Sequence, residues 1–313
     1  MRTVFAFLAL AGLLLSLGCG KTPPAGVSVD SAFRPFIPPG TQVLVSIDIE
    51  KAKDTEIYKR HRQEFDLPQL NALAERTGLD PRRDLSALLA IWDGSHPLLL
   101  AQGSFKADEL EKQLTRDGAQ RTRYKDYTLL GNAKQAIVFP KTHFALAGAA
   151  ATVRTALDSH TAGKAGLSEE LKQRLAGVPK SAQIWEVSAG GLPFAELPMP
   201  TDLESALSNI SGYVSGTSAG ITLANGVNVQ ADIFCVSNEG AQRVHDALRG
   251  IVGLSRLSTS TNRLDLLRLW DALHIDRDQQ AVHVRVELAP DLADKVLAEL
   301  PDLAGSAQDM LKR

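Results

Sequence analysis

The sequence has few cysteines, few aromatic residues and no excess of either charge. Only two of its 313 residues are cysteines, which excludes a disulfide-rich scaffold and a zinc site built from several thiolates. Its 34 lysines and arginines against 36 aspartates and glutamates give no basic footprint for nucleic acid. The hydrophobic fraction of 44% and the charged fraction of 22% are typical of a folded chain. We therefore expect one large domain or two ordinary domains, and no nucleic-acid partner.

The sequence also lacks the residue spacings of a metal or cofactor site. None of its seven histidines has a second histidine four residues away, and no Cys-x-x-Cys is present. Both spacings are typical of metal centres. His274 and His283 could face each other across a hairpin, but the polar turn between them lacks the glycine and later glutamate of a calcium loop. We expect no metal and no cofactor.

The N-terminus has the pattern of a bacterial export signal. Arg2 supplies a positive charge, and the residues from Val4 to Leu17 are apolar or small apart from Ser16. This run is shorter than the about 20 residues that a membrane-spanning helix needs. It matches the apolar core of a secretory signal peptide, which predicts that residues 1–18 are removed after export.

The apolar run leads into Leu15-Ser16-Leu17-Gly18-Cys19, which resembles the lipobox of bacterial lipoproteins. In that family a small residue precedes a cysteine that is lipidated on its sulfur and becomes the new N-terminus. Gly18 and Cys19 match the pattern, whereas Ser16 stands where the family usually has leucine. The resemblance implies cleavage between Gly18 and Cys19, acylation of Cys19 with chains such as palmitate, and a membrane anchor. In a host with two membranes, Gly20 in place of aspartate implies an outer-membrane lipoprotein that faces the periplasm.

A proline-rich stretch follows the expected anchor. Residues 19–40 contain five of the 15 prolines of the chain. Proline-rich segments are extended spacers of about 3.1 Å per residue, so we expect a tether that holds the body as much as about 60 Å from the membrane.

From Thr41 onward, alternating strand and helix patterns predict an α+β body. Asp93-Gly94 and Asn225-Gly226 sit between apolar runs, which predicts two hairpins. The strand and helix pattern starts again near Ala182, so we expect two similar halves of antiparallel hairpin strands packed against helices, at residues 41–165 and 166–313. The body, including Thr77-Gly78-Leu79-Asp80-Pro81 and the strand with Trp185, is similar to uncharacterised bacterial lipoproteins with duplicated α+β halves. That similarity implies no particular activity.

One motif is compatible with catalysis. Gly216-Thr217-Ser218-Ala219-Gly220 matches the Gly-x-Ser-x-Gly elbow of serine hydrolases, with Asp232 and His245 following in the hydrolase order. An elbow requires a helix after the serine, and the alternating apolar residues here predict a strand. We therefore interpret the motif as a Gly/Ser-rich turn and expect no catalytic residues. Cys235 shares a strand face with Ile233, which is typical of a small buried hydrophobe.

Two further features concern binding. The helix expected at residues 262–273 has apolar residues around most of its circumference, which is typical of a core helix. It could instead line an apolar groove through Leu266, Leu269, Trp270 and Leu273. Two short basic runs, Lys59-Arg60-His61-Arg62 and Arg82-Arg83, are most simply solvated surface, with contact to anionic lipid headgroups as the alternative.

The sequence thus favours a non-catalytic protein. We expect a lipid-anchored, extracytoplasmic binding protein whose body contacts a partner protein or a component of the cell envelope. The alternative is a carrier of an apolar small molecule or lipid between sheet and helices, and a third hypothesis is a serine hydrolase that uses Ser218. A cavity of several hundred Å³ would favour the carrier. A filled core with an exposed apolar patch would favour the binding protein.

Overall fold

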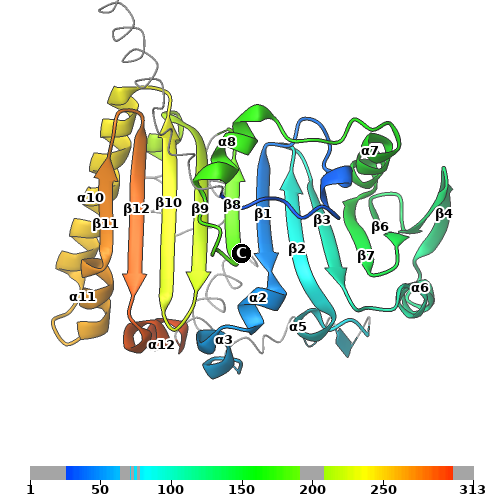
Figure 1. Cartoon of the computed structure of the whole chain (residues 1–313), viewed down its shortest axis with the longest axis horizontal. Helices are drawn as coiled ribbons and strands as arrows, with labels where there is room; N and C mark the ends of the chain where they lie inside the picture. The colour runs from blue at the N-terminus through cyan, green and yellow to red at the C-terminus, as the bar shows by residue number, and fades with distance from the viewer. Residues whose placement is uncertain (1–25, 64–70, 72–73, 76–77, 191–207, 299–313) are drawn as a thin grey trace, which may run out of the picture.

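The structure, a computed structural model, describes residues 26–63, 71, 74–75, 78–190 and 208–298. These residues form a twelve-stranded sheet in which every neighbouring pair of strands is antiparallel, with helices on both faces (Figure 1). The strands are β1 (Val43–Asp48), β2 (Leu85–Trp92), β3 (Pro97–Gly103), β4 (Gln120–Tyr124), β5 (Tyr127–Gly131), β6 (Gln135–Lys141), β7 (Phe144–Ala149), β8 (Ile184–Ser188), β9 (Val214–Leu223), β10 (Val227–Cys235), β11 (Leu273–Arg277) and β12 (Ala281–Leu288).

The helices flank the sheet and connect its hairpins. Several begin at a side chain that accepts a hydrogen bond from the first turn, as Ser168 does for α8 and Ser237 for α10. The helices are η1 (Arg34–Phe36, a 3₁₀ turn), α2 (Ile49–Lys53), α3 (Glu56–Arg60), α5 (Pro81–Asp84), α6 (Ala107–Arg116), α7 (Ala150–Thr161), α8 (Glu169–Gly177), α10 (Asn238–Ser258), α11 (Leu264–Asp271) and α12 (Pro290–Ala298).

The strand order repeats outward from the centre of the sheet. From the adjacent β1 and β8, one side runs β1-β2-β3-β7-β6 and the other runs β8-β9-β10-β12-β11. In each half, the three strands nearest the centre follow one another in the chain. The order then reverses, because β7 lies inside β6 in the first half and β12 lies inside β11 in the second. The strands β5 and β4 extend the first half only. This arrangement confirms the predicted α+β fold with two similar halves of antiparallel hairpin strands and helices.

Both predicted Asx-Gly turns close hairpins at corresponding places in the two halves. Asp93-Gly94 lies between β2 and β3, and Asn225-Gly226 lies between β9 and β10. A Cβ on Gly226 would lie 2.3 Å from the carbonyl oxygen of Leu288, so only glycine fits this approach of the turn to β12.

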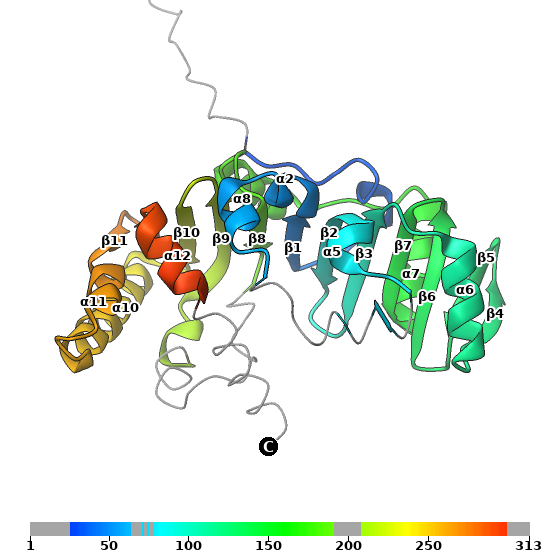
Figure 2. The same ribbon diagram turned by 90° about the horizontal axis from the view of Figure 1, so that it is seen from below.

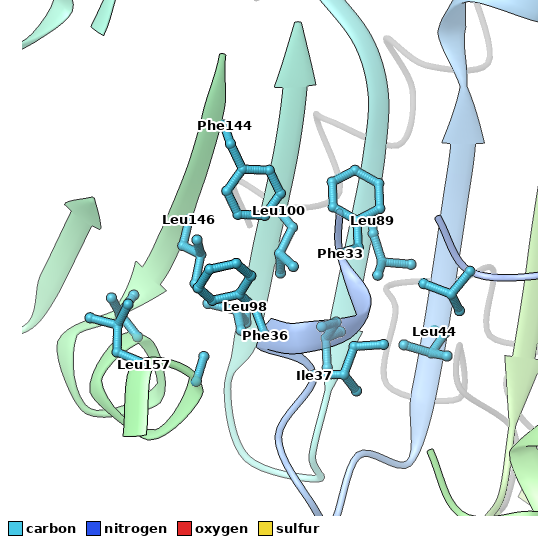
Figure 3. Packing of buried hydrophobic residues seen from close by; sticks show 14 of the residues in the cluster. Phe33, Phe36, Ile37, Leu44, Leu89, Leu98, Leu100, Phe144, Leu146 and Leu157 are labelled. Atoms are coloured by element: carbon cyan, nitrogen blue, oxygen red, sulfur yellow. The ribbon is translucent and has the colours of Figure 1, made fainter. Parts of the chain in front are cut away.

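The main core lies on the front face of the sheet, the face toward the viewer in Figure 1. There η1, α7 and α8 cover the apolar side chains of the central strands. Figure 3 shows Phe33, Phe36 and Ile37 from the N-terminal segment inserted among Leu89, Leu98, Leu100 and Leu146. The ring centroids of Phe36 and Phe144 are 5.0 Å apart, a distance typical of a packed aromatic pair.

This packing corrects the predicted tether at residues 19–40. Phe33, Phe36 and Ile37 are at most 1% exposed, and the amide of Val27 donates to the carbonyl of Val178 at 3.1 Å. Pro35, Pro38 and Pro39 therefore belong to a segment that is packed on the body, because burial of Phe33, Phe36 and Ile37 removes their apolar surface from water. Counted from Cys19, only residues 19–25 remain for a spacer, which would reach about 20 Å when extended.

Helices also cover the back face of the sheet, in three separate apolar clusters. Leu110 of α6 packs with Leu85, Val244 of α10 packs with Val282, and Leu292 of α12 packs with Leu288. Figure 2 shows the sheet edge-on between the helices of its two faces. The second half differs from the first because its front face carries polar side chains, among them Asp232, on β10 and β12.

Candidate docking surface

The helical hairpin of α10 and α11 forms one end of the molecule. Ser237 caps α10 by accepting a hydrogen bond from the amide of Gly240 at 3.0 Å. The first turns of α10 bury Ala241 and Val244 against the sheet. After these turns no residue of α10 is fully buried, and none is fully buried in α11. Figure 1 shows both helices beside β11, at the edge of the sheet.

Polar contacts hold α11 to its neighbours. Asp271 pairs with Arg256 of α10, and Arg268 pairs with Asp291 of α12 at 2.7 Å. The indole Nε1 of Trp270 donates to Thr259 Oγ1 at 3.1 Å. Each surface ion pair adds little stability by itself, but together with the packing of Leu269 on the cluster of α12 they fix the orientation of a helix that has no fully buried residue.

Three leucines at this end of the molecule face solvent, and we call them the leucine tip. Leu254 and Leu257 of α10 are 70% and 84% exposed, and Leu264 of α11 is 64% exposed. Only two other large apolar side chains among the described residues are exposed, Leu99 and Val236. Each exposed leucine forgoes about 1.5–3 kcal/mol that burial would supply. A cluster of them is typical of an interaction surface.

Charged side chains surround the leucine tip. Residues 249–268 contain four arginines and one aspartate, but Arg256 pairs with Asp271 and Arg268 pairs with Asp291, so part of the positive charge is compensated. The exposed leucines and these arginines share one amphipathic hairpin. Such a surface can dock on an apolar partner that carries polar groups at its rim.

The four residues of the predicted groove do not line one groove. Leu273 begins β11 and lines a cleft of 410 Å³ with Val252 and Ile275, whereas Leu269 packs into the cluster of α12. Trp270 turns to Thr259, and Leu266 is half-exposed. The prediction that these four residues together line one groove is therefore wrong. Its helix is also shorter than expected, because Leu273 leaves it for the edge strand. The interpretation of this helix as a core helix is wrong too, since none of its residues is fully buried.

The structure places the Gly-x-Ser-x-Gly motif in the middle of β9, so its interpretation as a Gly/Ser-rich turn is wrong: residues 216–220 are paired with β10 throughout. Ser218 is 2% exposed. The strand extends on both sides of it, from Val214 to Leu223, so the helix that an elbow requires after the serine is absent. Asp232 lies directly opposite Ser218, and His283 lies opposite Asp232 on the next strand. A hydrolase triad requires the imidazole between the serine and the carboxylate. Here the carboxylate stands between them, and His245 lies on α10.

A polar network that the sequence did not reveal surrounds Asp232. Its Oδ1 accepts from Arg285 at 2.9 Å and lies 2.8 Å from His283 Nδ1, while His283 Nε2 lies 3.3 Å from Asp278. Burial disfavours the charged imidazole, but the hydrogen bonds to Asp232 and Asp278 outweigh it and raise the pKa of His283. Within the described ranges, no group of three or more His, Cys, Asp or Glu side chains could hold a metal ion.

A second unforeseen polar group lies on the back face of β8. The Glu186 carboxyl accepts from Thr217 Oγ1 at 2.9 and 3.1 Å, and Thr217 is bonded in turn to Ser188. Glu186 is 6% exposed. Burial raises its pKa to about 7, although the hydrogen bond from Thr217 acts in the opposite direction. No sequence pattern marks such a glutamate, since its burial depends on three strands that meet in space.

The remaining predicted residues fall into two groups. Gly18 and Cys19, the predicted cleavage and lipidation site, lie outside the described residues. Cys235 is buried beside Val214 and Val282, and burial raises the pKa of its thiol, which confirms its interpretation as a small buried hydrophobe. No helix among the described residues has the length and apolar character needed to cross a membrane.

Comparison with known proteins gives a distant structural likeness and no family. No protein-family model matches the chain, and no curated protein is detectably similar to it in sequence. Crystal forms I, III and IV of TP0453 superpose with TM-scores of 0.45, 0.47 and 0.46 at 11%, 11% and 13% identity. The alignments cover 88%, 87% and 86% of this chain and 99%, 99% and 97% of those chains. Likeness at this level says nothing about function.

Proposed function

We propose that the protein is an exported, lipid-anchored, non-catalytic binding module that docks on a partner protein or another envelope component through the leucine tip. The observation that carries this proposal is the exposure of Leu254, Leu257 and Leu264 on one helical hairpin, since only two other large apolar side chains among the described residues are exposed. The pattern of Gly18 and Cys19 supports the anchor. The mid-strand position of Ser218 supports a role other than hydrolysis.

The docking step can be tested by photocrosslinking in cells. A photoreactive amino acid in place of Leu257 should give adducts that one in place of exposed Glu109 on α6 does not give. Adding Leu254→Ser and Leu264→Ser to the first chain should reduce those adducts about tenfold, because two apolar contacts are lost. Equal adducts at both positions would contradict the proposal. The chemical nature of a specific adduct separates a protein partner from an envelope lipid.

The anchor is tested separately. Cys19→Ser in the full chain should abolish acyl labelling and leave a larger precursor, because cleavage of a lipoprotein signal requires the lipidated cysteine. A matched Cys235→Ser chain should be labelled and processed normally, since that thiol is buried. Processing of the Cys19→Ser chain to the mature size would show that the signal is not of the lipoprotein type.

The carrier remains a second candidate because of one cleft beneath the N-terminal segment. It measures 440 Å³ and is lined mainly by apolar residues, among them Val29, Ile37 and Leu175. This volume is within the range of small-molecule sites. Native mass spectrometry of the mature protein should show a co-purified mass that leaves on denaturation if the cleft carries a ligand. A bare mass would argue against the carrier.

A further inference from the structure

The structure brings the two basic runs of the sequence to one cleft. Lys59 and Arg62 come from α3 and the turn after it, and Arg82 and Arg83 come from α5, about 20 residues later. Lys53, the last residue of α2, adds a fifth cation. The cleft measures 750 Å³, and no aspartate or glutamate is among the described residues that line it. Figure 1 shows α2, α3 and α5 along one border of the sheet.

The first basic run divides its side chains between the body and the cleft. Arg60 pairs with Asp294 of α12 at 2.9 Å, and His61 Nε2 lies 2.7 Å from the same carboxylate. These two residues therefore attach α3 to α12. Lys59 and Arg62 line the cleft instead, so the fold separates the cations that hold the body together from those that are presented to solvent.

Carboxylates outside the lining compensate only part of this charge. Lys59 pairs with Glu56 at 3.1 Å, Arg82 with Asp80 at 2.9 Å and Arg83 with Asp84 at 2.7 Å. The ammonium of Lys53 donates to the neutral carbonyl of Leu85 at 3.2 Å, and Arg62 has no carboxylate partner within the ranges that the structure describes. Among the described residues, Lys53 and Arg62 are therefore the two cations whose charge no carboxylate compensates.

Arg82 is held in place before any ligand arrives. Its Nε donates to Asp80 Oδ1 at 2.9 Å, and its Nη2 donates to Asn71 Oδ1 at 2.7 Å. Since Nη2 also donates to Asp80 Oδ2 at 3.2 Å, the Arg82 guanidinium is a fixed positive charge in the wall of the cleft. Lys53 and Arg62 supply the charge that remains uncompensated.

We propose that this cleft binds a phosphate-bearing ligand, with Lys53 and Arg62 neutralising the phosphate and the fixed charge of Arg82 adding positive potential beside it. Phosphate suits the cleft because several cations converge on one place and the described residues of its lining include no carboxylate. The volume exceeds that of inorganic phosphate, so the ligand is a phosphate attached to a larger group, whether a lipid headgroup or a soluble phosphate ester. This site is separate from the leucine tip and does not depend on the proposed function.

The test is a binding titration of the full chain with glycerol phosphate, and separately with vesicles of phosphatidic acid in phosphatidylcholine. Wild type should bind at least one of these probes saturably, and Lys53→Gln/Arg62→Gln should weaken that binding about tenfold or more. The matched control is Lys141→Gln/Lys164→Gln, which removes the same charge at exposed positions outside the cleft. It should bind like wild type.

Each outcome decides the proposal. Binding of glycerol phosphate alone assigns the site to a soluble ester, and binding of the vesicles alone assigns it to a lipid headgroup. No saturable binding to either probe, or equal weakening in the control pair, would overturn the proposal. Leu254→Ser/Leu257→Ser should leave glycerol phosphate binding unchanged, so failure of this site is distinguishable from failure of the docking proposal.

Discussion

Leu44 of β1 lies directly opposite Val187 of β8, and both side chains are completely buried on the front face of the sheet. This pair joins the two halves, because β1 and β8 are the strands from which the repeated order runs outward. The halves therefore share one sheet, and the front-face core extends from the first half to Trp185 and Val187 of β8, whereas β9 to β12 pack in clusters of their own.

Because of this junction, we predict that a cavity at Leu44 destabilises the whole molecule. Leu44→Ala should lower the free energy of unfolding by about 2–5 kcal/mol. Circular dichroism, and the fluorescence of Trp92 in the first half and of Trp185 and Trp270 in the second, should report one shared transition. Two separate transitions, with the second half unaffected, would show that the halves fold independently.

The N-terminal segment provides the second prediction. A chain that begins at Gly40 loses the buried Phe33, Phe36 and Ile37, and it should be unfolded or aggregated, since two large aromatic side chains and an isoleucine leave the core. A chain that begins at Gly26 retains these contacts and should show a cooperative thermal transition. The idea that residues 26–40 belong to the body fails if both chains melt at the same temperature.

The sequence predicted the general plan of the fold better than its details. Strand periodicity and the two Asx-Gly turns were sufficient for the hairpins, because both signals are local. The prediction of a tether was wrong because it was based on the number of prolines. The burial of Phe33 and Phe36 depends on contacts with strands far along the chain, which the local sequence does not show. The basic cleft could not be foreseen, since nothing in the sequence shows that Arg62 and Arg82 share one space.

Glu186 should make stability depend on pH. Its pKa of about 7 in the folded state exceeds the ordinary value of 4.5, so the folded chain binds the proton more tightly than the unfolded chain. The stabilisation is complete below pH 4.5, falls as the pH rises toward 7, and is absent above that. The difference of 2.5 pKa units corresponds to about 3 kcal/mol.

Chemical denaturation at pH 5 and pH 8 tests this dependence. Glu186→Gln keeps the shape of the side chain and removes the titration, so its loss of stability between the two pH values should be about 2–3 kcal/mol smaller than that of wild type. Identical pH profiles for the two chains would show that Glu186 does not titrate in the folded protein. Glu109→Gln, on an exposed face of α6, is the matched control and should follow wild type.

Exposure of the leucine tip predicts that its residues contribute little to folding. Leu257→Ser should change the free energy of unfolding by less than about 0.5 kcal/mol. Val244→Ala on the same helix, where the side chain is fully buried, should cost about 2 kcal/mol. A large loss from Leu257→Ser would mean that this leucine packs inside the protein and is not available to a partner.

The central claim is that the leucine tip is covered when the protein is in the cell envelope. Its most direct test is maleimide labelling of Leu257→Cys, once in isolated envelopes and once in purified protein, with Lys141→Cys as the exposed control. Docking predicts that Leu257→Cys is labelled several-fold more slowly in envelopes than after purification, while the control reacts equally in both. Equal labelling of Leu257→Cys in the two preparations would contradict the account.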